Sequence, residues 1–169
     1  DAGSAKVRKG KGIAREIREG NILAVIKWME SNRDRLYKTA IVYSGDKNID
    51  SVFERAIVRI SENIKELKDD RQFGPWAISM LLNECRKYAP AAGVTRVSDE
   101  VSCDKSSSMI GYVRKLKGIE KDAVVLKYYG GFSADEISLI LRMSVDEARH
   151  EVYRGLKVIT AEANRAVQP

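Results

Sequence analysis

Two capping boxes, eleven residues apart, constrain the fold of this chain more than any other feature. In each box a serine precedes a glutamate by three positions: Ser133 with Glu136, and Ser144 with Glu147. The serine oxygen of such a box accepts from the backbone N–H of the glutamate, and the glutamate side chain accepts from the serine N–H, so each box marks the first turn of a helix. The pair predicts a helix of about nine residues, a short turn at Arg142, and a second, longer helix.

This order is that of a helix-turn-helix, whose second helix can enter the major groove of DNA. The predicted second helix buries an apolar stripe and turns Arg149, Arg154 and Lys157 outward. The same helix carries acids that repel phosphates, namely Asp146, Glu147 and Glu151. An αα-corner in a purely structural bundle is the alternative, and the outward basic side chains favour the DNA-binding interpretation over it.

The rest of the chain is also helical in pattern, because apolar residues recur every three or four positions and no long alternation predicts a strand. The segment Ser44-Gly45-Asp46 predicts a break, and Ser51 with Glu54 can form a capping box for a helix over Asp50 to Asn63. Residues 90–107 are small and polar, as in a linker. We therefore expect an all-α protein with two small helical domains, 12–89 and 108–165, joined by a flexible linker at 90–107.

Composition excludes several classes of protein. The 169 residues include 30 Lys and Arg and 24 Asp and Glu, for a net charge of +6 and a pI near 9.3. No apolar run approaches the roughly 18 to 20 residues that cross a bilayer, so we expect no direct membrane insertion and a cytoplasmic location. Two cysteines and one histidine at these spacings predict no metal site, no catalytic triad and no cofactor, hence no enzyme.

Four stretches follow one another in the order of a known family. They are IAREIREGN with DRLYKTAIVYSGD (13–46), DSVFERAIVRISENIKEL (50–67), RQFGPWAISMLLNECRKYA (71–89), and LKGIEKDAVVLKYYGGFSADEISLILRMSVDEARHEVYRGLKVI (116–159). Together they resemble a bacterial sigma factor of the small two-domain extracytoplasmic-function group. In this comparison Arg142 replaces the small residue that the family places in the turn.

The resemblance implies three contact surfaces. The helix over 50–63 would bind core RNA polymerase, the segment over 67–87 would melt and read a −10 element, and the helix-turn-helix would read a −35 element. The side chains assigned to core polymerase are Asp50, Glu54, Arg55 and Arg59. Those assigned to the −10 element are Asp69, Asp70, Arg71, Gln72, Asn83, Arg86 and Lys87. Those assigned to the −35 element are Ser144, Arg149, His150, Arg154 and Lys157.

The function expected from this resemblance is to direct core RNA polymerase to specific promoters and to assist initiation, with core polymerase and promoter DNA as partners. The resemblance also implies an anti-sigma factor that covers the protein when it is not on polymerase. Two alternatives stay open: a stand-alone helix-turn-helix regulator, and a sigma-like interaction module that sequesters a regulatory protein. The melting-type segment favours a sigma factor over the stand-alone regulator, and the acids of the last helix keep the sequestering module open.

Overall fold

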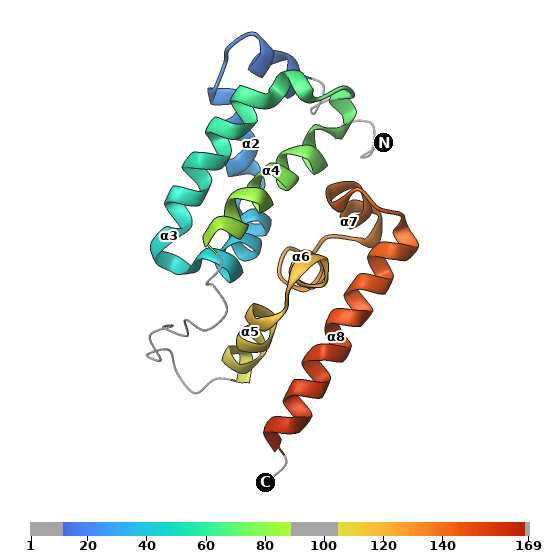
Figure 1. Ribbon diagram of the computed structural model, residues 1–169. Helices are drawn as coiled ribbons and strands as arrows, with labels where there is room; N and C mark the ends of the chain where they lie inside the picture. The colour runs from blue at the N-terminus through green and yellow to red at the C-terminus, as the bar shows by residue number, and fades with distance from the viewer. Residues whose placement is uncertain (1–11, 89–104, 168–169) are drawn as a thin grey trace.

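The computed structural model describes residues 12–88 and 105–167, and within these ranges the secondary structure is entirely helical (Figure 1). This confirms the all-α prediction. An N-terminal helical body and a C-terminal helical body follow each other along the chain. Residues 90–104 of the predicted linker lie outside the described residues, whereas residues 105–107 are helical, because the next helix begins at Lys105. No helix in the described ranges combines the length and apolarity that a bilayer crossing requires.

The N-terminal body is built around one long, kinked helix. Residues 12–18 are helical, and α2 (Leu23–Ser31) leads into α3 (Arg33–Asn63). The short turns η1 (Ile64–Glu66) and η2 (Asp70–Gln72) then connect α3 to α4 (Phe73–Tyr88). The kink lies at Gly45, whose φ of 70° and ψ of 173° are not helical.

Gly45 occupies the left-handed region of φ that favours glycine, so the predicted break at Ser44–Asp46 is confirmed as a kink. The second half of α3 resumes directly after the kink. The prediction that a helix starts at Asp50 with a Ser51–Glu54 capping box is therefore wrong, because these residues lie inside the helix. A helical turn already formed upstream leaves no free N-terminus to cap there.

The core of this body lies between α3 and α4. The side chains of Val52, Ala56 and Ile60 are buried on α3, and α4 buries Phe73 and Leu81 in the same core. Trp76 is also buried, in an aromatic group where the Phe73 ring lies 5.3 Å from Trp28 and 6.2 Å from Trp76 between centroids. Trp76 is therefore a core residue of this body.

The C-terminal body contains α5 (Lys105–Lys115), α6 (Gly118–Tyr128), α7 (Ala134–Leu141) and α8 (Val145–Val167). Both predicted capping boxes are present. Glu136 N donates to Ser133 Oγ at 3.2 Å and Glu147 N donates to Ser144 Oγ at 3.1 Å, and both glutamates accept from the serine N–H in return. The predicted helix, turn and longer helix are thus confirmed as α7, residues 142–144 and α8.

Two residues determine how α8 is placed relative to α7 and α6. Arg142 ends α7 in the left-handed conformation, at φ 57° and ψ 54°, and its backbone reverses the chain between the helices. Gly155 lies where α8 crosses α6, and a Cβ added there would stand 2.4 Å from a methyl of Val124. Only glycine lets the two helices approach so closely.

Candidate nucleic-acid and polymerase interfaces

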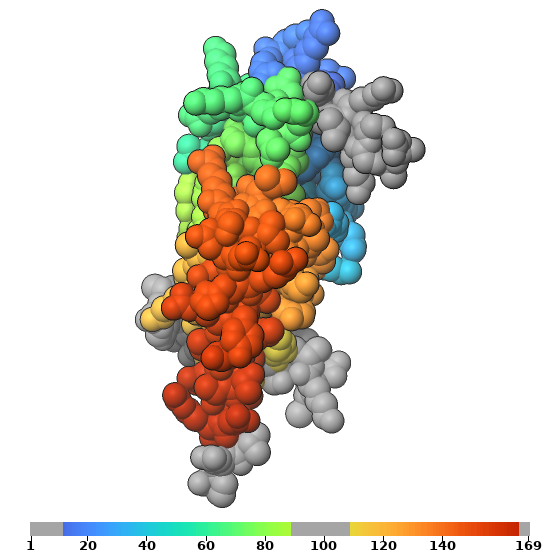
Figure 2. Space-filling view, turned by 90° about the vertical axis from the view of Figure 1, so that its right-hand side faces the viewer, coloured from blue at the N-terminus to red at the C-terminus, as the bar shows by residue number. Residues whose placement is uncertain are grey.

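The outward side of α8 carries the residues predicted to contact the −35 element. Arg149, His150, Arg154 and Lys157 are all exposed, whereas Ala148, Val152 and Ile159 face the core. In Figure 2, α7 and the full length of α8 lie across the face toward the viewer. Ser144 is exposed as well, but its hydroxyl oxygen already accepts the capping bond from Glu147.

The acids of α8 are engaged within the helix. Asp146 lies 3.6 Å from Arg149 and Glu151 lies 3.4 Å from Arg154, measured between carboxylate oxygen and guanidinium nitrogen. Hydrogen bonds from Ser144 hold the pKa of Glu147 below its usual range. The repulsion that these acids exert on phosphates is therefore partly neutralised by neighbouring arginines and by the cap.

One exposed aromatic on this helix was not among the predicted contacts. Tyr153 is 56% exposed, and Lys157 Nζ lies 4.9 Å from the centre of its ring. An exposed tyrosine beside two basic residues is suited to contact a sugar or a thymine methyl. Its position between Val152 and Arg154 is the sequence signal that could have identified it, since it falls off the apolar stripe.

The residues predicted to contact core polymerase lie on the second half of α3. Asp50, Glu54, Arg55 and Arg59 are all exposed. A shallow hollow of about 470 Å³ opens beside them between α3 and α4. Its lining consists of Glu54, Arg55, Val58, Arg59, Glu62, Glu84 and Lys87. Val58 is 48% exposed in the middle of these charges, which gives the surface an apolar centre.

Glu84 forms the floor of this hollow. Its side chain is 2% exposed and accepts from Arg59 Nε at 3.1 Å and from Lys87 Nζ at 2.9 Å. Burial alone would raise the pKa of this carboxyl, but the bonds from Lys87 and Arg59 outweigh it, and the pKa lies below its usual range. Glu84 is thus a buried carboxylate that holds two surface cations in place, and sequence analysis missed it.

The residues predicted to contact the −10 element form two groups rather than one. Residues 69–72 lie before and within η2 at the start of α4, and Asn83, Arg86 and Lys87 lie near its end. At 1.5 Å per residue, α4 separates the groups by about 20 Å. An extended strand of several nucleotides would be needed to touch both.

The first group is held by ion pairs. Arg71 pairs with Asp69 at 3.0 Å, and Arg18 donates to both carboxylate oxygens of Asp70 and to the Leu67 carbonyl at 3.1 Å. Arg18 therefore ties the helical segment 12–18 to the loop. It fixes the loop's shape from outside, and no motif in the sequence predicts this pairing.

The second group contacts the C-terminal body. Arg86 donates from Nη1 to Asn83 at 2.7 Å and from Nη2 to Asp122 of α6 at 2.6 Å. Asp122 is 3% exposed, and it also accepts from the hydroxyl of Tyr43. A residue predicted to bind DNA is therefore paired with an acid of the other body.

The described ranges contain no cluster of three or more His, Cys, Asp or Glu that could hold a metal ion. Cys85 is buried in the core of the N-terminal body, and burial raises the pKa of its thiol to about 12. A thiol with such a pKa is protonated at neutral pH and is a poor nucleophile.

Comparisons with known proteins agree with this geometry. Residues 109–159 match the family described as Sigma-70, region 4. This match spans α6, α7 and most of α5 and α8, including both capping boxes. Residues 109–159 therefore form a domain similar to Sigma-70, region 4. Region 4 is the promoter-binding domain of sigma factors.

A solved structure shows that the likeness extends to the fold of nearly the whole chain. The structure is described as CnrH in complex with the cytosolic domain of CnrY, and it superposes with a TM-score of 0.69 at 18% sequence identity. The match covers 93% of this chain and 98% of the other. No curated protein matches the chain by sequence. The N-terminal body, which the family match does not include, thus has the fold of the corresponding part of CnrH.

Proposed function

We propose that this chain is a sigma factor of the extracytoplasmic-function type, which directs core RNA polymerase to specific promoters. The observation that carries the proposal is the region 4 domain, with its exposed basic row on α8, joined to an N-terminal body of CnrH-like fold. A protein that holds both polymerase and DNA needs separate surfaces for them. The row on α8 and the face of α3 with its hollow are separate, and they differ in charge pattern.

The −35 element would be bound by α8. Arg149 and His150 lie near its N-terminal end, where a recognition helix contacts base edges. Arg154 and Lys157 lie further along and would contact phosphates, which position the helix without reading sequence. Ser144, at the cap, would contribute its exposed backbone and side chain to the same groove.

Core polymerase would bind the face formed by Asp50, Glu54, Arg55 and Arg59. Exposed charges around the partly exposed Val58 match the usual pattern of an interface, with an apolar centre and a polar rim. Glu84 supports this face from below. The −10 element would be contacted by residues 69–72 and by Asn83, Arg86 and Lys87, and since core polymerase and promoters are intracellular the site of action would be the cytoplasm.

An anti-sigma factor would control this activity. CnrH was solved with the cytosolic domain of CnrY bound. For the present chain we propose a partner that covers the α3 face and α6, so that its binding excludes core polymerase. A stable ternary complex of this protein, the partner and core polymerase would show that control acts at a later step.

Reconstitution with core polymerase tests the proposal. The full chain should produce transcripts with defined start sites from a library of genomic promoter fragments, and core polymerase alone should not. If the chain binds a second protein tightly but yields no specific transcripts with core polymerase, the sequestering module is the correct interpretation.

A charge-reversed pair on α3 tests the polymerase-binding face. Glu54→Lys with Arg55→Glu keeps the net charge at +6 and should weaken core binding by about tenfold or more, about 1.4 kcal/mol. Arg59 is left unchanged, because an acid at that position would face the buried Glu84. Asp34→Lys with Lys38→Asp, an exposed pair on the first half of α3, is the matched control and should leave core binding unchanged.

A further inference from the structure

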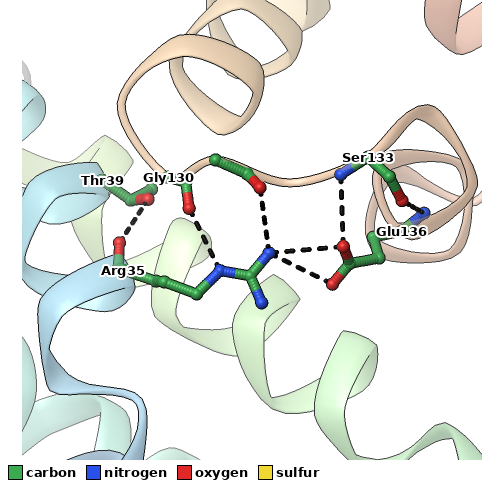
Figure 3. A network of polar contacts seen from close by, with 6 residues as sticks. Arg35, Thr39, Gly130, Ser133 and Glu136 are labelled. Atoms are coloured by element: carbon green, nitrogen blue, oxygen red, sulfur yellow. Dashed lines mark hydrogen bonds and ion pairs between the residues drawn. The ribbon is translucent and has the colours of Figure 1, made fainter. Parts of the chain in front are cut away.

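The two helical bodies are joined by three arginine contacts that cross between them. Arg35 of α3 donates from Nε to the Gly130 carbonyl at 3.1 Å, and from Nη2 to the Gly131 carbonyl and to Glu136 at 3.2 Å each. Its guanidinium also lies 3.9 Å from the centre of the Phe132 ring. Figure 3 shows this side chain inserted between the end of α6 and the capping box of α7.

The second contact is the carboxylate of Asp122, which lies between two residues of the N-terminal body. One oxygen accepts from the hydroxyl of Tyr43 and the other from Arg86 Nη2 at 2.6 Å. Both oxygens are satisfied although the group is only 3% exposed. Lys121 Nζ lies 4.9 Å from the centre of the Tyr43 ring on the same side of α6.

The third contact runs in the opposite direction and depends on the kink of α3. Arg114 of α5 donates from Nε to the Val42 carbonyl at 3.1 Å. A helix end leaves its last four carbonyls without intrahelical donors, and Val42 stands three residues before the kink at Gly45. The interruption of α3 thus supplies an acceptor for the C-terminal body.

Gly130 allows the bodies to approach this closely. A Cβ at this position would stand 2.6 Å from Oγ1 of Thr39 in α3, and 2.5 Å from the Phe132 ring. The backbone of Gly130 does not have a positive φ, so its lack of a side chain is required by proximity rather than by conformation.

Two charged residues of α6, Lys121 and Asp122, are buried, at 7% and 3% exposed. Buried charges are unusual in a permanent core, but they are readily solvated when two surfaces separate. The contacts that the arginines and Tyr43 make across this interface are therefore of a kind that lets the two bodies separate.

From this arrangement we propose that the free protein adopts a closed state. In this state the Asp122 carboxylate pairs with the Arg86 guanidinium at the position that a phosphate of promoter DNA would take. The inference rests on the proposed function, in which Arg86 contacts DNA near the −10 element. The carboxylate of Asp122 is an internal substitute for a phosphate, and Nη2 of Arg86 becomes free to pair with DNA when the bodies separate. Arg35 and Arg114 hold the closed state at its two ends.

Two measurements on the full chain test this inference. The variant Arg35→Ala with Asp122→Ala removes one positive and one negative charge, so its net charge stays at +6. Small-angle X-ray scattering should show a larger radius of gyration than that of the unaltered chain. Asp34→Ala with Lys38→Ala, an exposed ion pair on the same helix, is the matched control and should show no expansion.

The second measurement is affinity for a labelled single-stranded DNA of mixed sequence, which suffices because phosphate contacts do not depend on sequence. The open variant should bind about tenfold more tightly, as expected if only about a tenth of the unaltered chain is open. Adding Arg86→Ala to the open variant should remove that gain. If Arg35→Ala with Asp122→Ala fails to fold by circular dichroism, Gly130→Ala provides a second way to open the interface without a change of charge.

Absence of expansion in both open variants would overturn the closed state. Expansion without tighter DNA binding would overturn the role of Asp122 as a substitute for phosphate. The scattering measurement does not involve polymerase, so it tests the closed state independently of the proposed function. If the unaltered chain fails to support specific transcription, the proposed function is wrong, and the scattering result still decides whether the closed state exists.

Discussion

Arg59 of α3 donates a hydrogen bond to the carboxylate of Glu84 on α4 at 3.1 Å, so an exposed cation of the proposed polymerase-binding face is held by an acid from the interior. Lys87 makes a second bond to the same oxygen at 2.9 Å. The other oxygen, Oε2, is buried and has no hydrogen-bond partner in the protein. Glu84 therefore depends on these two cations for its stability in the core.

Replacement of Glu84 with Gln should destabilise the protein. The amide preserves the shape but loses the charge that both cations face, and hydrogen bonds to charged groups contribute about 1.5 to 3 kcal/mol. Because Arg59 and Lys87 are about half exposed, we expect the lower part of that range. Urea denaturation measures the loss. Glu162→Gln, which breaks an exposed pair with Arg165, is the matched control and should cost about 0.5 kcal/mol or less.

The same carboxylate predicts a pH dependence. The pKa of Glu84 is lower in the folded state than its ordinary value of 4.5, so its contribution to stability is present above about pH 4.5 and is lost as the pH falls through the folded pKa. The difference in unfolding free energy between the unaltered chain and Glu84→Gln should therefore be largest near neutral pH and should shrink below pH 4.5. A difference that stays constant down to pH 3 would show that Glu84 acts through its shape alone.

Much of the fold follows from local signals. The boxes at Ser133 and Ser144 define α7 and α8, because a capping box is satisfied entirely within one turn. The helical period also brings Ala56 and Ile60 to the same buried face of α3, because residues four apart share one side of a helix. The start of α3's second half was misplaced because Ser51 and Glu54 fit the same motif inside a helix that had already begun.

The contacts between distant segments could not be predicted in the same way. Asp122 and Tyr43 are 79 residues apart, and nothing local to either shows that they meet. A flexible linker of the kind predicted at 90–107 permits many placements of the two bodies. The pairing of Arg18 with Asp70 and of Arg59 with Glu84 was also missed, since ion pairs between helices depend on how the helices pack.

The two ends of the basic row on α8 should respond differently to mutation. Ala at Arg149 or His150 should change which −35 sequences are used, since side chains at this end would read bases. Ala at Arg154 or Lys157 should weaken all promoters alike and reduce the slope of log affinity against log salt by about one per phosphate contact. A selection from randomised −35 sequences, repeated at several salt concentrations, separates these outcomes. If the double variant of Arg149 and His150 retains the original preference, base readout lies elsewhere.

The loop at 69–72 should matter for opening DNA rather than for binding it. Ala at Asp69, Asp70, Arg71 and Gln72 should impair transcription from duplex promoters far more than from templates already mismatched at −10, because the mismatch removes an unpairing cost of a few kcal/mol. Arg18→Ala should reproduce part of this defect, since it releases the loop while leaving all four side chains in place. Arg15→Ala, which breaks only an exposed pair with Glu19 in the same helical segment, is the matched control. Equal impairment on duplex and mismatched templates would show that the loop supports folding or docking instead of strand separation.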